Sequence, residues 1–290
     1  MISLQKGIPD DMMKVAGRVK FAALLKYGQI TWRRRPLPDF IILGAQKCGT
    51  TSLHHYLRQH PQLMSSPYRK EIHFFDGGVN SKTDVFEKGE TWYRAHFGTR
   101  KPGGLPQKTF EASPVYIFNP LVAERISELI PDARFIILLR NPTDRAISHY
   151  FHERKLDREP LPIMEAMQAE EERLRPALET RNYRDERFIH YSYKSRGHYC
   201  EQIRRYLDFF PIKNVFIMDS KELLAEPTNA LRRVFEFLGV DSAFRVKDLK
   251  PLNVAANKDK VAPAVRTYLD GHFRSHNQAL YELTGRDFGW

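Results

Sequence analysis

Apolar residues along the chain gather in short runs, separated by longer stretches with helical spacing. A short apolar run predicts a buried strand, whereas apolar residues three and four positions apart predict a helix. The runs place strands at 40–44, 109–112, 134–139 and 214–218. The spacing places helices at 50–60, 84–97, 119–130, 142–155, 162–180, 188–209, 228–238 and 261–284. Strands that alternate with helices are typical of a parallel sheet covered by helices on both faces, so the sequence predicts an α/β fold.

The chain is expected to form one large domain, because 290 residues can bury a substantial core and no internal repeat divides them. We assign residues 39–290 to this domain and residues 1–38 to a basic N-terminal arm. Within the arm, the spacing of the apolar residues predicts an amphipathic helix. The segment 151–190 is highly charged and has no strand signal, which predicts a helical excursion from the sheet.

Composition narrows the possible partners. The chain carries 46 basic and 35 acidic residues, a formal net charge of +11, which favours a polyanionic ligand or substrate. We expect no nucleic-acid partner, because the sequence has no zinc-ligand spacing, RNP box or helix-turn-helix signal. One of the two cysteines, Cys48, lies in a glycine-containing turn, a poor place for a structural disulfide, so we expect a reducing, cytoplasmic location. No apolar stretch reaches the roughly 20 residues of a transmembrane segment.

The strongest chemical signal follows the first predicted strand. Gly44 and Gly49 enclose a turn that carries Lys47, and a helix is expected to begin at Thr50. Glycine lets the backbone approach an anion, a helix start presents free N–H groups, and lysine adds a positive charge. The lysine precedes the second glycine instead of following it, so the turn is not a Walker A motif. The predicted phosphate-binding residues are Lys47, Cys48, Gly49, Thr50, Thr51 and Ser52.

A second anion site is predicted after the strand at 134–139. That strand delivers Arg140 to the edge of the sheet, and Ser148 lies two turns along the helix that follows. An arginine and a serine placed in this way can hold a second phosphate. The alternative is that Arg140 pairs with Asp144 and that Ser148 only packs against its neighbours.

A third signal is the segment Lys70–Asp76. Glu71 and His73 alternate with apolar residues, so on a strand they would point to the same face. A carboxylate beside an imidazole can serve as a general base with an orienting partner. The alternative is a surface pair of Lys70 with Glu71 and a histidine whose hydrogen bonds are satisfied within the protein.

Together these segments resemble the sulfotransferases that use 3′-phosphoadenosine 5′-phosphosulfate. The resemblance is to the heparan sulfate N- and 3-O-sulfotransferases and their bacterial relatives, and it runs from about residue 38 to the end. It implies a P-loop-like, three-layer architecture. It also implies that Gly44–Thr51 binds the 5′-phosphosulfate and that Arg140 and Ser148 bind the 3′-phosphate. Ser195–Tyr199 and the C-terminal stretch from His276 to Trp290 fit the same family.

The resemblance also assigns roles near the reacting atoms. Lys70–Asp76 is similar to the segment that carries the catalytic glutamate of the family. Glu71 would accept the proton of the acceptor, Lys47 would stabilise the leaving phosphate, and His73 would orient the base or the acceptor. Contacts to the acceptor are expected from Lys70, Asp76 and Arg196, and further contacts to the donor from Lys258 and Lys260.

Three features depart from the heparan sulfate enzymes. Ala112 stands where those enzymes usually carry a lysine that borders the reaction centre. The stretch Asn257–Lys260 is basic but lacks the glycine of their Lys-Gly-Arg loop. The cysteine pair common in the Golgi-resident relatives is absent. Ala112 argues against a heparan-like acceptor, the altered loop concerns contacts to the cofactor, and the missing cysteine pair agrees with a cytosolic protein.

The sequence thus predicts an enzyme that moves a sulfuryl group from this donor to a hydroxyl or amine, with a carbohydrate as the expected acceptor and without a metal. One alternative is a P-loop nucleotide or small-molecule kinase, which the position of Lys47 and an absence of magnesium dependence would exclude. The other is a non-catalytic module that binds polyanions. The pair of Glu71 and His73 argues against that module, because anion binding has no use for a carboxylate there.

Overall fold

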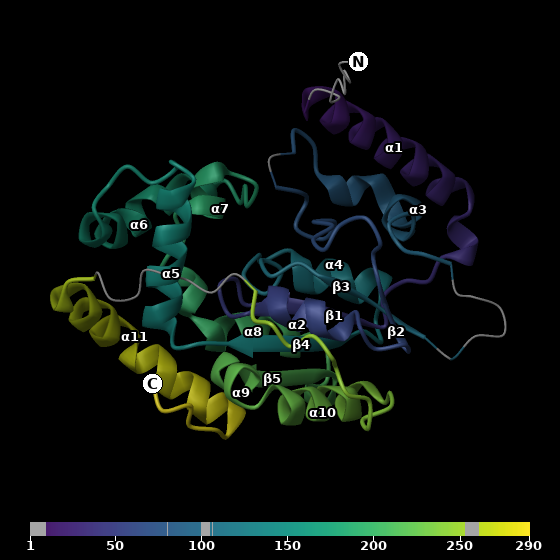
Figure 1. Ribbon diagram of the computed structural model, residues 1–290. Coiled ribbons are helices and arrows are strands. Elements are labelled where there is room, and N and C mark those ends of the chain that lie inside the picture. Colours follow the sequence, from purple (N-terminus) through teal and green to yellow (C-terminus); the bar gives the residue numbers. More distant parts are fainter. Residues whose placement is uncertain (1–9, 80, 100–104, 106, 253–260) are drawn as a thin grey trace, which may run out of the picture.

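Five parallel strands form the central sheet, in the order β2-β3-β1-β4-β5. The structure is a computed structural model that describes residues 10–79, 81–99, 105, 107–252 and 261–290. Helices lie on both sides of the sheet (Figure 1). The α/β prediction is therefore confirmed. The strands are β1 (Phe40–Gly44), β2 (Leu63–Ser65), β3 (Lys108–Ala112), β4 (Arg134–Leu139) and β5 (Val215–Asp219).

The middle strands are apolar along their whole length because helices cover both faces of the sheet. Every residue of β1 is buried, as are five of the six residues of β4. Phe40 is paired with Phe110 of β3, and their rings stack with centroids 4.9 Å apart. Four strands were predicted within a residue or two of their bounds. The short β2 was not predicted, because its three residues, Leu63–Ser65, are too few to form a recognisable apolar run.

Most helices form where the spacing predicts them. Their bounds are α1 (Asp10–Ile30), α2 (Thr50–Leu57), α3 (Gly89–Arg94), α4 (Val122–Leu129), α5 (Pro142–Lys155), α6 (Ile163–Glu179), α7 (Glu186–His190), α8 (Tyr199–Leu207), α9 (Ser220–Ala225), α10 (Pro227–Leu238) and α11 (Pro263–Thr284). Short 3₁₀ turns occur at η1 (Trp32–Arg34), η2 (Val85–Lys88), η3 (Ser195–Gly197) and η4 (Ile212–Asn214). The stretch 84–97 divides into η2 and α3, and α9 was not predicted.

The prediction of one continuous helix over 188–209 is wrong. The chain leaves α7 after His190, passes through η3 and enters α8 at Tyr199. The break brings Gly197 so close to α11 that a Cβ atom on it would lie 2.6 Å from the ring of Phe273. A continuous helix with a larger residue at this position would not fit against α11. The apolar spacing carries no signal for this contact.

The charged segment 151–190 leaves the sheet as helices, as predicted. It holds the end of α5, all of α6 and α7. Glu170 of α6 is buried and accepts hydrogen bonds from the backbone N–H of Ser195 at 2.8 Å and of Lys194. These bonds fasten α6 to the η3 region. In Figure 1 this group of helices lies on one side of the space above the sheet, and α1 and α3 lie on the other.

The end of the basic N-terminal arm packs against the domain. Arg35 is only 5% exposed and donates a hydrogen bond to the carbonyl of Phe97. Arg94 of α3 in turn donates to the carbonyl of Arg35 at 2.6 Å. Among the described residues, no helix combines the length and apolar character that crossing a membrane requires.

The order of the strands fixes where a ligand can bind. The chain moves from β1 to one edge of the sheet through β2 and β3, and then returns to place β4 on the other side of β1. Such a reversal opens a crevice outside the carboxyl ends of the two strands. The turns that follow β1 and β4 therefore meet at the centre of the sheet edge, where both predicted anion sites lie.

Candidate active site

The turn after β1 requires glycine at two positions. A Cβ atom on Gly44 would lie 2.6 Å from Cγ2 of Ile117 and 2.8 Å from the carbonyl oxygen of Pro114, so no side chain fits. Gly49 has φ of 91°, in the left-handed region that other residues rarely adopt. Together they bend the chain directly from β1 into α2.

The start of α2 presents unpaired N–H groups. The first helical hydrogen bond runs from the N–H of Leu53 to the carbonyl of Gly49, at 3.1 Å. Within the described residues, the N–H groups of positions 49–52 have no hydrogen-bond acceptor. Four free donors at a helix N-terminus attract an anion. This geometry agrees with the predicted phosphate site.

Lys47 supplies a half-buried cation beside these donors. Its ammonium has no hydrogen-bond or ion-pair partner in the part of the chain that the structure describes. Burial lowers the pKa of Lys47, and the nearby Arg140 and Arg145 lower it further, while Glu153 opposes them. An anion at the turn would relieve this repulsion, so the local electrostatics favour binding of a phosphate.

The side chains of the other predicted turn residues are buried or form hydrogen bonds within the protein. The Cys48 thiol is buried, which raises its pKa to about 11 and keeps it protonated, and the N–H of Cys48 already donates to Ala45. The hydroxyl of Ser52 accepts a hydrogen bond from the N–H of Leu252 at 2.9 Å. Thr50 is buried. The remaining contacts to an anion are therefore expected from backbone N–H groups more than from these side chains.

The second anion site forms beside the first. The guanidinium of Arg140 donates to the carbonyl of Lys47 at 3.3 Å, so the turns after β1 and β4 touch. The Asn141 side chain caps α5. Ser148 is 7% exposed, and its hydroxyl has no hydrogen-bond partner among the described residues. The alternative pairing of Arg140 with Asp144 is loose, at 3.9 Å, and Asp144 lies closer to Arg266, at 3.1 Å.

The structure brings Glu71 and His73 together, but not on a strand. The segment is irregular, and His73 has a left-handed backbone with φ of 56°. Nε2 of His73 lies 3.3 Å from Glu71, and its Nδ1 lies 2.6 Å from Asp76. The strand prediction is thus wrong here, because the positive φ, and not the alternation of a strand, turns the imidazole between the two carboxylates.

The two carboxylates and the imidazole perturb one another. Burial would raise the pKa of Glu71, but hydrogen bonds from His73 and Lys70 outweigh it and lower the pKa to about 2. Burial would lower the pKa of His73, but Asp76 and Glu71 raise it to about 10. At neutral pH Glu71 is therefore ionised and His73 is a cation. Glu71 keeps 37% of its side chain exposed, so it can reach an acceptor.

Lys70 joins this segment to the anion turn. Its ammonium donates to Thr51 Oγ1 at 3.2 Å and to Glu71 Oε1 at 2.9 Å. One lysine therefore contacts both the start of α2 and the exposed carboxylate. This bridge fixes the proposed base beside the phosphate site.

Sequence reasoning missed the residues that support the segment. The Tyr116 hydroxyl accepts hydrogen bonds from the N–H groups of Phe74 at 2.8 Å and of Phe75 at 3.4 Å. Below it, the buried carboxylate of Glu111 accepts from Ser113 at 2.6 Å and from Tyr93. In the sequence, the available signal is that Glu111 and Ser113 flank Ala112, the position at which the chain departs from the heparan sulfate enzymes.

Arg196 lies between the anion turn and α7. It is 3% exposed and donates to Gln46 Oε1 at 2.8 Å, to Ser192 Oγ at 2.7 Å and to the carbonyl of Ile189 at 2.9 Å. Together with Asp76, it also lines a small, partly open pocket whose other walls include Val115, Phe118, Tyr183 and Phe188. Arg196 thus supports the turn and borders a space next to the Glu71 segment.

Two further predicted features complete the site. Ala112 is fully buried at the end of β3, beside Ile42 of β1, so this position offers no charge to an acceptor. Lys258 and Lys260 lie outside the described residues.

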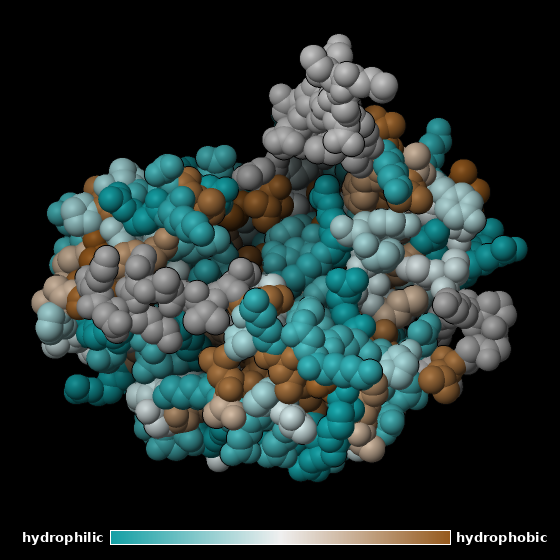
Figure 2. Space-filling view, viewed as in Figure 1, coloured by the Kyte–Doolittle hydropathy of each residue, from teal (hydrophilic) through white to brown (hydrophobic). Residues whose placement is uncertain are grey.

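Figure 2 shows a recess between the part of the molecule that carries α6 and α7 and the part that carries α1 and α3. Its floor is mainly hydrophilic.

A family model and a solved structure match this chain over most of its length. Residues 37–262 match the model of the sulfotransferase domain. A sulfotransferase from Alicyclobacillus acidocaldarius has a similar structure, with a TM-score of 0.69 and 32% sequence identity over 87% of this chain and 98% of that one.

Curated relatives are similar at lower identity. Heparan sulfate glucosamine 3-O-sulfotransferase 5 from Mus musculus is 29% identical over 88% of this chain and 74% of that protein. The membrane-associated sulfotransferase kil1 from Dictyostelium discoideum is 26% identical over 88% of this chain. The present chain spans 66% of the length of the latter protein.

Proposed function

Because the chain belongs to the sulfotransferase domain family, and is therefore a sulfotransferase, we propose that its donor is 3′-phosphoadenosine 5′-phosphosulfate. We further propose that its acceptor is a hydroxyl, or an amine, of a carbohydrate. The family supplies the reaction class. The donor, the acceptor and the roles of individual residues are argued below from the contacts of the site.

Two neighbouring anion sites support a donor that carries phosphate groups at both ends of a nucleoside. The free N–H groups at 49–52 and Lys47 would hold the 5′-phosphosulfate. Arg140 and the unpaired hydroxyl of Ser148 would hold the 3′-phosphate. Lysine, arginine and helix N-termini bind phosphate through charge-assisted hydrogen bonds.

The transfer exchanges one bond to sulfur for another. The acceptor oxygen forms a bond to sulfur, the bond between sulfur and the bridging phosphate oxygen breaks, and the acceptor proton passes to Glu71. Negative charge grows on the leaving phosphate, where Lys47 and the N–H groups of the turn would stabilise it. His73, held by Asp76, would fix the direction of the Glu71 carboxylate. Catalysis by this route is mainly a matter of positioning and charge.

One observation carries this proposal. Lys70 donates to Thr51 on the donor side and to Glu71 on the acceptor side, at 3.2 and 2.9 Å. The base is thereby held next to the place where sulfur would lie. A module that only binds anions gains nothing from a carboxylate in this position.

The direct test incubates the purified chain with donor carrying radiolabelled sulfate and a panel of acceptors. The panel holds polysaccharides, glycolipids, phenols and polyketide alcohols, and mass analysis locates the label. We expect the label on a carbohydrate hydroxyl or amine. Label found only on phenols or polyketide alcohols would contradict the proposed acceptor, and the absence of transfer to every member of the panel would contradict the donor.

We expect the transfer rate to be insensitive to chelation. The groups proposed to neutralise the leaving phosphate are Lys47 and the N–H groups of the turn, so the reaction needs no bound divalent ion. The measurement compares kcat with and without EDTA, at a temperature well below the melting temperature. A loss of activity that magnesium restores would instead favour phosphoryl transfer.

Substitution His73→Ala should shift the pH dependence of kcat/KM. In the native protein Glu71 stays ionised down to about pH 2, so it produces no acid limb near pH 5. Without the hydrogen bond from His73, burial raises the pKa of Glu71, and activity should fall at a higher pH than in the native protein. His55→Ala serves as the control. If kcat/KM of His73→Ala falls at the same low pH as in the native protein, His73 does not control the pKa of Glu71.

A further inference from the structure

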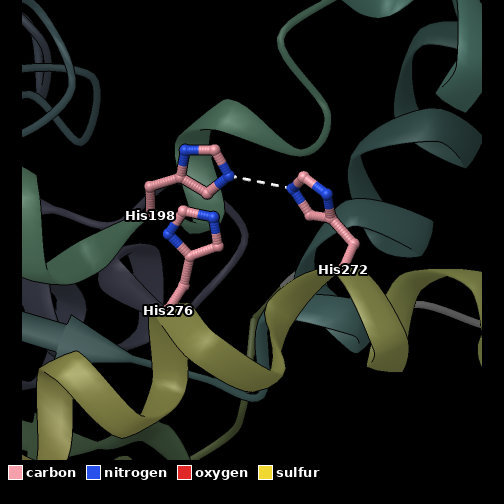
Figure 3. A group of neighbouring side chains, drawn as sticks. All are labelled: His198, His272 and His276. Carbon is pink, nitrogen blue, oxygen red and sulfur yellow. Dashed lines mark hydrogen bonds between the residues drawn. The ribbon is translucent and has the colours of Figure 1, made fainter.

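Three histidines that the transfer chemistry does not use meet in the fold. His198 immediately precedes α8, whereas His272 and His276 lie one turn apart on α11. Nε2 of His198 lies 2.9 Å from Nε2 of His272, and the rings of His198 and His276 stack with their centroids 3.8 Å apart. Figure 3 shows a nitrogen of each ring directed toward the space between the three rings.

The spacing of these nitrogens suits a single metal ion. One nitrogen from each ring lies within 4.8 Å of the other two. A tetrahedral zinc ion binds imidazole nitrogens at about 2.0–2.1 Å, which places them roughly 3.3 Å apart. The rings of His198 and His276 are stacked at an interplanar angle of 6°, and an imidazole binds a metal in its ring plane, so one of the two rings must rotate out of the stack to reach a common ion. Two histidines at i and i+4 on one helix are a spacing that zinc sites use.

The carboxylate of Glu201 lies beside one of the three rings, that of His276. Oε1 of Glu201 lies 3.5 Å from Nδ1 of His276. A carboxylate in this position holds a proton on Nδ1 and leaves Nε2 free to bind a metal.

We propose that His198, His272 and His276 bind one divalent transition-metal ion of the zinc class, with water in the fourth position. His198 is far in the sequence from His272 and His276, which is why the sequence predicts no metal site. The ion would cross-link the start of α8 to α11, two elements that already pack closely at Gly197 and Phe273. Its role would be structural, because binding to the folded protein alone stabilises that state.

The test uses the full chain without a histidine tag, stripped of metal by EDTA and then titrated with Zn²⁺ alone. We expect one ion per chain and a rise in melting temperature of roughly 3–6 °C at a hundred-fold excess over the dissociation constant. Co²⁺ should produce the visible ligand-field absorption of a tetrahedral site. Binding of less than one ion per chain, or an unchanged melting temperature, would overturn the proposal.

Variants separate this site from other metal-binding groups. His272→Gln and His276→Gln keep a polar side chain of similar length on α11, and both should lose the metal-dependent shift. His55→Ala, remote from α11, should retain it. The melting temperature without metal checks that each variant is folded. If the glutamine variants respond to Zn²⁺ as the native protein does, the ion binds elsewhere, and the three histidines are not its ligands.

Discussion

Replacing Lys47 with alanine should lower kcat by roughly 10²- to 10³-fold or more, equivalent to about 2.7–4 kcal/mol of lost transition-state stabilisation. Lys47 is the cation that the turn after β1 places beside the free N–H groups of α2, and no carboxylate of the described chain pairs with it. Its removal leaves the charge on the leaving phosphate uncompensated. Steady-state rates with saturating donor and acceptor measure the effect.

The fold should tolerate this substitution. Lys47 has φ of 71°, and alanine meets the same backbone restriction, so the strain does not change. We therefore expect the melting temperature of Lys47→Ala to stay near that of the native protein. Lys213→Ala, on the exposed η4, is the matched control and should retain full activity. Full activity in Lys47→Ala would contradict the proposed role of Lys47 in stabilising the leaving phosphate.

Glu71→Gln should lower kcat by roughly 10²- to 10⁴-fold while leaving the affinity for the donor nearly unchanged. Glutamine keeps the shape of the side chain, and its one carbonyl oxygen can accept from Lys70 or from His73, but it cannot take up a proton. Calorimetry with 3′-phosphoadenosine 5′-phosphate measures the affinity of the nucleotide site, and single-turnover rates measure the chemical step.

A control isolates the role of this carboxylate. Glu90→Gln removes a comparable carboxylate that pairs with Arg94 on α3, and it should leave the rate unchanged. If Glu71→Gln instead weakens nucleotide binding many-fold, the carboxylate acts by holding Lys70 against Thr51, and the general base must be sought elsewhere.

The sequence predicts the strand, turn and helix start around Lys47 because that geometry is local. A strand, a glycine turn and a helix start are consecutive in the chain. The first anion site can therefore be predicted from the positions of Gly44, Lys47 and Gly49 alone, without knowledge of tertiary contacts. The same holds for Arg140 and Ser148, which follow β4. Only the sheet order was needed to bring the two turns together.

The remaining features depend on contacts between distant segments. The break between α7 and α8 follows from the approach of Gly197 to Phe273, which lies on a helix far along the chain. The hydrogen bond of Lys70 to Thr51 and the meeting of His198 with α11 are of the same kind. Apolar periodicity reports which face of an element is buried, but not which partner covers it.

The proposed donor contacts and the proposed base also lie in different connections of the sheet. The proposed donor contacts come from the turns after β1 and β4. Glu71 lies in the connection from β2 to β3, and α6 and α7 lie between β4 and β5. Connections tolerate sequence change because they do not disturb the buried strands. If the proposed roles hold, changes in these connections would alter the acceptor side and leave the proposed donor contacts in place. A chimera that exchanges only these connections is the natural starting point for redirecting the enzyme to another acceptor.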